Sequence, residues 1–172
     1  MKSIDSGAYS IHFNEHCYVE LNSFLESSNF SNIFIFVDIN THEYCLPTFL
    51  SNISYSCELE IIEMEAGEHH KNLDTCTQVW HTLSELDADR KSLLINLGGG
   101  VVTDLGGFVA STFKRGISFI NVPTSLLAMV DASVGGKTGV DLGGLKNQVG
   151  IINFPKMVLI DPLYLDTLNE SE

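Results

Sequence analysis

The sequence predicts an α/β fold with a mainly parallel, Rossmann-like sheet flanked by helices and preceded by an N-terminal β-hairpin. Three observations predict this class. Short β-rich runs alternate along the chain with segments whose apolar residues recur at helical spacing. The run 33–37 is apolar without interruption, as in a parallel strand that is buried on both faces. A second, largely apolar run, 92–97, leads directly into three glycines, which indicates a turn from strand to helix.

The hairpin is predicted from segments 9–13 and 17–21, which are separated by a three-residue turn. A helix is expected over 42–53, where Pro47 must lie near the start or bend the helix. The later elements are, in order, a strand at 58–64, a helix at 73–86, a strand at 92–100 that ends in glycines, a helix at 101–112, a strand at 117–124, a short helix at 125–130, a glycine loop at 135–144 and a strand at 156–161. Ligands of such sheets bind beyond the carboxyl ends of the strands.

Composition excludes several classes of function. The net charge of −13 argues against a nucleic-acid partner, because binding to phosphate backbones requires clustered Lys and Arg. No apolar run approaches the roughly 20 residues of a membrane span, and the N-terminus lacks the apolar core of a secretory signal. The four cysteines form no C-x-x-C pair, which favours structural thiols in a reducing compartment. We therefore expect a soluble cytoplasmic protein with no membrane partner.

The few basic residues are placed unusually. Lys71, Arg115, Lys137 and Lys146 lie beside glycine-rich or polar turns and not on amphipathic helix faces. In an acidic protein, cations in such positions indicate a local pocket for phosphate or carboxylate groups. The alternative is that each is a solvated surface charge.

One candidate motif is the glycine cluster 98–100 at the end of a strand, which is a weak signal by itself. Backbone N–H groups and the dipole at the start of the following helix can bind a pyrophosphate there. The spacing is not that of G-x-G-x-x-G, because position 103 is Thr, and a tight turn without a ligand remains an alternative. Asp104 lies in the first helical turn, where a carboxylate is also simply favourable to the dipole.

Two further groups of charged residues are candidates for ligand binding. In the turn 67–71, Glu68 is suited to ribose hydroxyls and Lys71 to phosphate, although a solvated turn is the alternative. Asp131 and Lys137 flank a glycine-rich segment, where packing alone does not explain them and a structural ion pair remains possible. The segment 135–139 is not a P-loop, because the required earlier glycine falls at Asp131.

The segments GGGVVTDLGGFVASTFKRG, VPTSLLAMVDASVGGKTGVD and LKNQVG, in this order and spacing, resemble the 3-dehydroquinate synthase family. The resemblance runs from about Asp38 to Thr167. It implies conversion of 3-deoxy-D-arabino-heptulosonate 7-phosphate to 3-dehydroquinate and phosphate in the shikimate pathway. It also implies NAD as a cofactor, a divalent metal (zinc or cobalt) in the full-length enzyme, a sugar phosphate as substrate and a homodimer.

The resemblance also assigns roles to residues. It implies that Asp38 and Asn40 face the adenosine end of NAD, and that Arg115 reaches a phosphate across a dimer interface. The remaining implied cofactor contacts are Glu68, Lys71, Gly99, Gly100, Val101, Val102, Thr103, Asp104, Thr124, Ser125, Asp131, Lys137, Lys146, Tyr164 and Thr167. The implied catalytic group is Asp131, Lys137, Lys146, Asn147 and Arg115.

The sequence departs from the family pattern in three respects. Leu145 stands where the family usually has Gly, and Ser125 stands where it usually has Thr. No histidine of this chain matches the family's metal ligands, so we expect no metal site here and an inactive NAD-binding domain over 1–172, without the helical metal-binding domain. Two alternatives remain: the equivalent domain of another sugar-phosphate cyclase, making 2-deoxy-scyllo-inosose or a valiolone, and a non-catalytic nucleotide-binding module.

Overall fold

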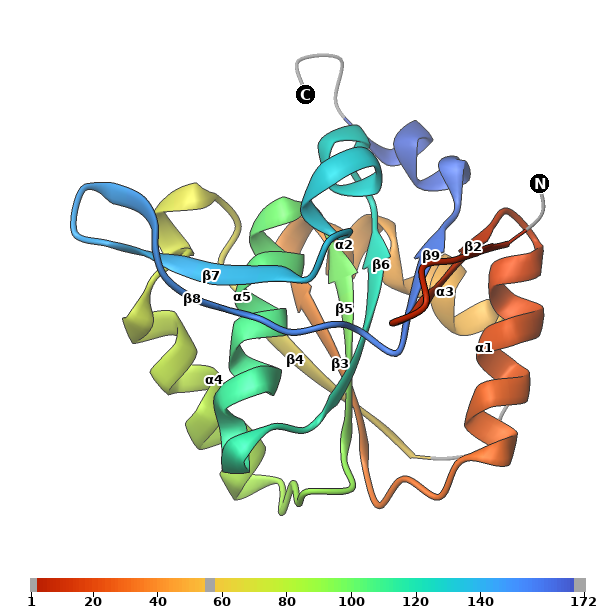
Figure 1. Ribbon diagram of the computed structural model, residues 1–172, viewed down its shortest axis with the longest axis horizontal. Helices are drawn as coiled ribbons and strands as arrows, with labels where there is room; N and C mark the ends of the chain where they lie inside the picture. Colours follow the sequence, from red (N-terminus) through yellow and green to blue (C-terminus); the bar gives the residue numbers. More distant parts are fainter. Residues whose placement is uncertain (1–2, 55–57, 169–172) are drawn as a thin grey trace.

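A computed structural model describes residues 3–54 and 58–168 (Figure 1). Seven strands form one sheet in the order β1-β2-β9-β6-β5-β3-β4, and every neighbouring pair except β1 with β2 is parallel. These strands are β1 (Ile4–Asp5), β2 (Ser10–Phe13), β3 (Ile33–Asp38), β4 (Leu59–Met64), β5 (Leu93–Gly98), β6 (Ser118–Pro123) and β9 (Met157–Ile160). The predicted α/β class with a mainly parallel sheet is confirmed.

In the described part of the chain, five α-helices flank the sheet: α1 (His16–Ser27), α2 (Ile39–Tyr44), α3 (Leu46–Ser51), α4 (Leu73–Glu85) and α5 (Gly100–Thr112). Shorter turns are η1 (Glu68–His70), η2 (Phe113–Arg115) and η4 (Pro162–Thr167), which are 3₁₀-helical, and η3 (Ala128–Ala132), which is π-helical. The predicted helix over 42–53 is two helices, with Pro47 in the first turn of α3, where its missing N–H costs no hydrogen bond.

The core has two parts, one on each face of the sheet. Side chains of β3 alternate between them: Ile33, Ile35 and Val37 pack with α1 and α3, whereas Phe34 and Phe36 pack with α4 and α5. Figure 1 shows α4 and α5 on one side of the sheet and α1 and α3 on the other. A strand that is covered on both faces needs apolar residues at every position, which explains the uninterrupted run 33–37.

The predicted N-terminal hairpin exists, but with a different partner strand. Residues 10–13 form β2 as expected, and their antiparallel neighbour is β1. The prediction of a strand at 17–21 is wrong, because these residues belong to α1. Cys17, Leu21 and Leu25 recur every four residues and bury one helical face, while Val19 on the opposite face is 61% exposed.

The predicted glycine loop at 135–144 is wrong over most of its length. Lys137–Leu142 forms β7 and pairs antiparallel with β8 (Leu145–Ile152). Gly139 and Gly150 face each other in this hairpin, and a Cβ on Gly150 would lie 2.3 Å from the carbonyl oxygen of Thr138. Glycine is required there by the close approach of two strands and not by a flexible loop.

The described cysteines behave as predicted for structural thiols. Cys17, Cys45 and Cys76 are buried and form no disulfide among the described residues. Burial raises the pKa of Cys17 and of Cys76 to about 12, so both thiols stay protonated and unreactive at neutral pH. The fourth cysteine, at position 57, lies outside the described residues.

Candidate functional site

A cleft of about 770 Å³ lies beyond the carboxyl end of β5. It is bounded by η1, the start of α5, η3 and the β7–β8 hairpin. The turn from β5 into α5 is tight, since a Cβ on Gly98 would lie 2.6 Å from the Cβ of Val102. The first turn of α5 therefore opens directly on the cleft. Its lining residues are Glu68, Lys71, Gly100, Val101, Asp104, Leu127, Asp131, Ala132, Lys137, Thr138, Gly139, Lys146, Asn147, Gln148, Gly150, Ile151 and Ile152.

A largely buried ion pair forms part of the cleft wall. The Nζ atom of Lys71 lies 3.0 Å from Oδ2 of Asp104 and 3.8 Å from Oε1 of Glu68. Lys71 is 4% exposed, and its backbone carbonyl accepts a hydrogen bond of 2.9 Å from the N–H of Asp141 in β7. Burial raises the pKa of Asp104, and the bond from Lys71 opposes that rise. The side chain and the backbone of Lys71 thus connect η1, α5 and β7.

Two exposed lysines of the hairpin face the same cleft. Lys146 lies 3.1 Å from Glu68 and Lys137 lies 2.6 Å from Asp131, so each connects the hairpin to another element. The side chains of Lys146 and Lys137 are 71% and 57% exposed. The hydrogen bond to Asp131 raises the pKa of Lys137. Exposed ion pairs contribute little stability, so both ammonium groups are available to an anion.

The charged side chains that line the cleft have a net charge of zero, although the chain as a whole is strongly negative. Its lining contains three carboxylates and three lysines: Glu68, Asp104, Asp131, Lys71, Lys137 and Lys146. The whole chain carries −13. The cleft is therefore much less negative than the rest of the molecule, as an anion-binding site requires.

Asn147 lines the cleft in a left-handed backbone conformation, with φ of 54°. Its N–H donates a hydrogen bond of 2.7 Å to Oδ1 of Asp141, which stabilises this conformation. Leu145 is the first residue of β8 and pairs with Leu142. Its φ is not positive, so the residue that replaces the usual glycine meets no conformational barrier.

Several predicted cofactor contacts support the turn and do not line the cleft. The hydroxyl of Thr103 donates to the carbonyls of Gly99 and Gly100, both at 3.2 Å. The N–H of Thr124 donates to the carbonyl of Gly98 at 3.0 Å. Val102 is fully buried, and Ser125 Oγ accepts from the N–H of Ala128 at 3.4 Å. These residues fix the backbone whose N–H groups begin α5.

A second predicted group lies apart from the cleft, around the ends of β3 and β9. Asp38 caps α2 by accepting a hydrogen bond of 2.8 Å from the N–H of Thr41, and Asn40 is exposed in the first turn of that helix. The Tyr164 hydroxyl is buried against that of Tyr18 at 3.0 Å. Thr167 donates to the carbonyl of Tyr164. The side chain of Tyr164 therefore belongs to the core, and its backbone N–H donates to the carbonyl of Asp161 at 3.2 Å.

Arg115 is far from the cleft of its own chain. It is exposed in the turn that follows α5, with φ of 72°. The cleft lies at the first residue of α5, and a helix of 13 residues is about 20 Å long. The predicted role of Arg115 at a phosphate of a second protomer stays a prediction.

Sequence reasoning missed the apolar wall and the hairpin floor of the cleft. Eight of the lining residues were not predicted: Leu127, Ala132, Thr138, Gly139, Gln148, Gly150, Ile151 and Ile152. The pair Gly143–Gly144 between two runs of similar length was the available signal for a hairpin.

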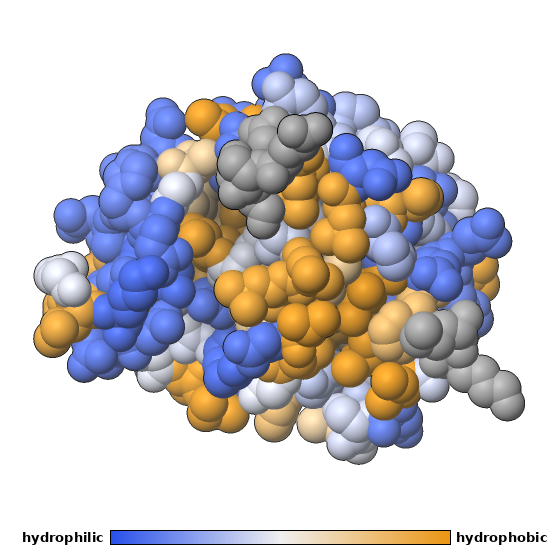
Figure 2. Space-filling model, turned by 90° about the horizontal axis from the view of Figure 1, so that it is seen from above, coloured by the Kyte–Doolittle hydropathy of each residue, from blue (hydrophilic) through white to orange (hydrophobic). Residues whose placement is uncertain are grey.

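Apolar side chains also gather on the surface at the mouth of the cleft. Figure 2 shows a continuous hydrophobic area on the upper face of the molecule. Leu127, Ile151 and Ile152 line the cleft and are 67%, 45% and 66% exposed. Contiguous exposed apolar surface of this kind marks contact surfaces.

A parallel sheet with helices on both faces and a charged cleft beyond its strand ends defines a Rossmann-like α/β domain. Within that class, residues 61–172 match the family described as 3-dehydroquinate synthase N-terminal. The chain belongs to the 3-dehydroquinate synthase family, as its motifs predict.

Two relatives show the extent of the similarity. The chain is 49% identical over 152 residues to a 3-dehydroquinate synthase of Parabacteroides distasonis, a match that covers 88% of this chain and 43% of the relative. It is 42% identical over 170 residues to a 3-dehydroquinate synthase of Campylobacter jejuni, covering 98% of this chain and 46% of the relative. The chain thus spans less than half the length of these curated relatives.

Solved structures agree on the fold. A 2-deoxy-scyllo-inosose synthase complexed with carbaglucose-6-phosphate, NAD+ and Co2+ superposes with a TM-score of 0.85 at 26% identity, covering 95% of this chain and 46% of that one. A 2-epi-5-epi-valiolone synthase from Streptomyces hygroscopicus with NAD+ and Zn2+ bound gives 0.82 at 24% identity, with 98% and 47% coverage. The second match shows the fold alone.

Within residues 3–54 and 58–168, no helix is both long and apolar enough to cross a bilayer.

Proposed function

We propose that residues 1–172 form the NAD-binding N-terminal domain of a 3-dehydroquinate synthase. The observation that carries the proposal is the cleft at the start of α5, where the buried Lys71–Asp104 pair lies beside the two exposed lysines of the hairpin. Family membership and 49% identity to a named 3-dehydroquinate synthase support it.

The whole protein, on this proposal, converts 3-deoxy-D-arabino-heptulosonate 7-phosphate to 3-dehydroquinate and inorganic phosphate in the cytoplasmic shikimate pathway, as a homodimer. NAD supplies a reversible hydride acceptor for a secondary alcohol of the substrate. A divalent metal, zinc or cobalt, belongs to a helical domain that follows this one in the whole protein. No histidine is among the residues that line the described cleft, so the cleft lacks the imidazole ligands that the resemblance assigns to that metal. The 172-residue chain is therefore inactive alone.

The residues of the cleft suit NAD in size and chemistry. Its volume of about 770 Å³ is that of a cofactor site. The N–H groups at Gly100 and Val101 begin α5 and suit a pyrophosphate. Beside them, Asp104 and Glu68 offer carboxylate oxygens to ribose hydroxyls, and Lys71 holds both carboxylates in place.

The hairpin lysines suit the substrate phosphate. Lys137 and Lys146 come from neighbouring strands and face the same space as Asn147. In the free protein, Asp131 and Glu68 hold the two ammonium groups within hydrogen-bond distance. A bound dianion would take over these donors, and charge-assisted bonds would keep it in position. The lysines thus orient the group that leaves and offset its charge.

A second candidate is the equivalent domain of another sugar-phosphate cyclase. The observation in its favour is the TM-score of 0.85 with a 2-deoxy-scyllo-inosose synthase. The identity of 26% in that match is well below the 49% with a 3-dehydroquinate synthase, which favours the latter. Assay of the full-length protein with heptulosonate phosphate against glucose 6-phosphate distinguishes the two.

A thermal-shift titration with NAD tests the cofactor proposal. Binding to the folded state alone raises the melting temperature with ligand concentration. We expect a saturable rise for the wild-type chain and none for Asp104→Asn, which keeps the shape of the side chain but removes its charge. Lys91→Ala alters an exposed lysine remote from the cleft and serves as the control. No rise in the wild type at millimolar NAD would contradict the proposal and leave a module without cofactor function.

A further inference from the structure

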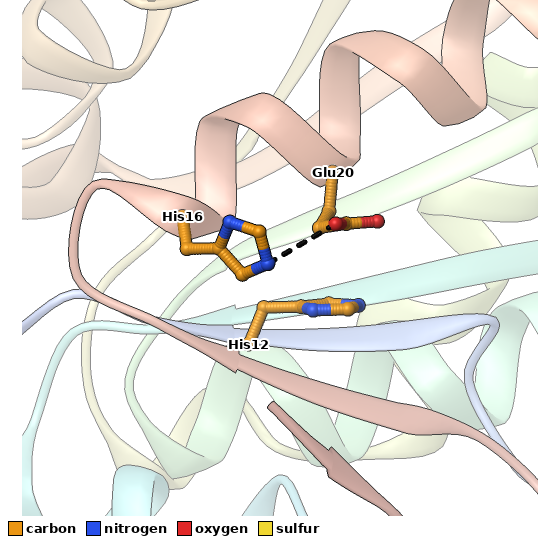
Figure 3. A group of neighbouring side chains, drawn as sticks. All are labelled: His12, His16 and Glu20. Atoms are coloured by element: carbon orange, nitrogen blue, oxygen red, sulfur yellow. Dashed lines mark ion pairs between the residues drawn. The ribbon is translucent and has the colours of Figure 1, made fainter. Parts of the chain in front are cut away.

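Three metal-ligating side chains meet near the N-terminus, on the β1–β2 side of the sheet and away from the cleft. His12 lies on β2, whereas His16 and Glu20 lie one turn apart on α1. One ligand atom from each residue lies within 4.8 Å of the other two. Figure 3 shows His16 and Glu20 projecting from the helix over the ring of His12. Between β2 and β5 of the cleft lie β9 and β6.

We propose that His12, His16 and Glu20 form a binding site for a zinc-type divalent transition metal. Two imidazole nitrogens and one carboxylate oxygen are a donor set that zinc accepts, with the fourth tetrahedral position left to water. Calcium and magnesium prefer sites made entirely of oxygen atoms. Bonds of about 2.0–2.2 Å bring ligand atoms closer together than they are here, and small rotations of the two exposed side chains suffice for that.

The surroundings of His12 favour metal binding. Its Nδ1 lies 2.8 Å from the hydroxyl oxygen of Ser3, and in the tautomer in which Nδ1 donates this bond, the Nε2 lone pair is available to a metal. His12 is 7% exposed as a residue, so packing already orients its ring before a metal arrives.

A simple surface ion pair does not explain the whole cluster. His16 Nε2 lies 3.1 Å from Glu20 Oε1, an ordinary contact between residues four apart on a helix. That contact requires no third residue, yet the buried ring of His12 approaches from a different element at 5.9 Å between ring centroids. A cation placed between the three groups would bind all of them at once. The strong negative charge of the chain further favours a cation.

Zinc titration into the tag-free, chelator-treated chain tests this site. Calorimetry is expected to give about one zinc per chain for the wild type. His16→Ala and Glu20→Gln remove exposed ligands without disturbing the core. Each should weaken zinc binding more than about 10-fold, because even the loss of a residue that only hydrogen-bonds a metal ligand weakens binding by about that factor. His81→Ala, an exposed histidine on α4, is the matched control and should bind like the wild type.

Two further measurements keep the test decisive. Co2+ in place of zinc should give the intense visible bands of a tetrahedral site in the wild type and lose them in His16→Ala. Circular dichroism and the NAD thermal shift should be the same in His16→Ala as in the wild type, which separates this site from the cleft. The inference fails if the wild type does not bind zinc at tens of micromolar, or if His16→Ala binds it as tightly as His81→Ala does.

Discussion

At the scale of single residues, Lys71 is the most constrained charge of the cleft. It is 4% exposed and has two carboxylate neighbours, Asp104 at 3.0 Å and Glu68 at 3.8 Å. Lys71→Met removes the charge but keeps the length of the side chain, which leaves Asp104 buried without its partner. We expect a loss of about 3 kcal/mol in the free energy of unfolding, measured by urea denaturation. The double variant Lys71→Met/Asp104→Leu should recover most of it, and equal losses in both variants would contradict this account.

The pH dependence of stability provides a second test of Asp104. Burial raises its pKa in the folded protein above the value in the unfolded chain. The folded state therefore binds the proton more tightly, so this residue's contribution to stability falls as pH rises between the unfolded and folded pKa values. We compare the free energies of unfolding of the wild type and Asp104→Asn across the acidic range. The stability of the wild type relative to the variant should fall as pH rises between the two pKa values, and the difference between the two proteins should be constant at higher pH. A difference that grows in favour of the wild type with rising pH would refute the assignment.

Lys146 should matter for binding and not for folding. Its side chain is 71% exposed, so Lys146→Ala should change the free energy of unfolding by less than about 0.5 kcal/mol. Loss of one charge-assisted hydrogen bond should weaken the binding of an anion by about 10-fold or more. Calorimetry with inorganic phosphate measures this, and Lys114→Ala, an exposed lysine at the other end of α5, is the control. Equal affinities in the two variants would remove Lys146 from the site.

At the scale of elements, the β7–β8 hairpin forms one wall of the cleft and depends on a close approach of its strands. Gly150→Ala would place a Cβ 2.3 Å from the carbonyl oxygen of Thr138. We expect a loss of about 1–3 kcal/mol and weaker NAD binding, because the strands must separate. Gly144→Ala is the matched control, since a Cβ there meets no atom within 4 Å and its φ is not positive. Similar melting temperatures for the two variants would show that the hairpin is not tightly paired.

The same elements show how far the sequence predicts the structure. Strand β3 is predictable because burial on both faces leaves an uninterrupted apolar run. Strand β5 is predictable because a largely apolar run, interrupted by Asn96, leads into glycines. Residues 17–21 are wrongly predicted as a strand because Cys, Tyr and Val have high strand propensity. The packing of α1 against the core, which the local sequence does not show, stabilises the helix instead. The glycines of the β7–β8 hairpin suggest a loop, although two of them are where the strands come closest.

For the cleft, the residue types were predictable and most of their contacts were not. Asp131 and Lys137 are only six residues apart, so the sequence leaves a pair between them open as an alternative, and the structure shows this contact. Lys71 and Asp104 are brought together by β5 and by the turn at Gly98. They are 33 residues apart, and no pattern in the sequence predicts their contact. Lys146 reaches Glu68 only because the hairpin folds over η1.

At the scale of the whole molecule, the chain spans less than half the length of its curated relatives. We expect no release of phosphate from 3-deoxy-D-arabino-heptulosonate 7-phosphate when the 172-residue chain is supplied with NAD and zinc. The cleft as described has no histidine on its lining, and its mouth is open and apolar, so the cleft by itself does not exclude water. The full-length relative from Parabacteroides distasonis is the positive control, and zinc-dependent turnover by the short chain would contradict the proposal.

The central claim is that NAD binds in the cleft at the start of α5. Nuclear magnetic resonance of the ¹⁵N-labelled chain during an NAD titration tests it most directly, because each backbone amide reports its own surroundings. We predict saturable shifts concentrated at 99–104, at Lys71 and along the hairpin near Lys137 and Lys146. No shift at millimolar NAD, or shifts confined to the separate cavity beside Tyr18 and Asp161, would contradict the claim.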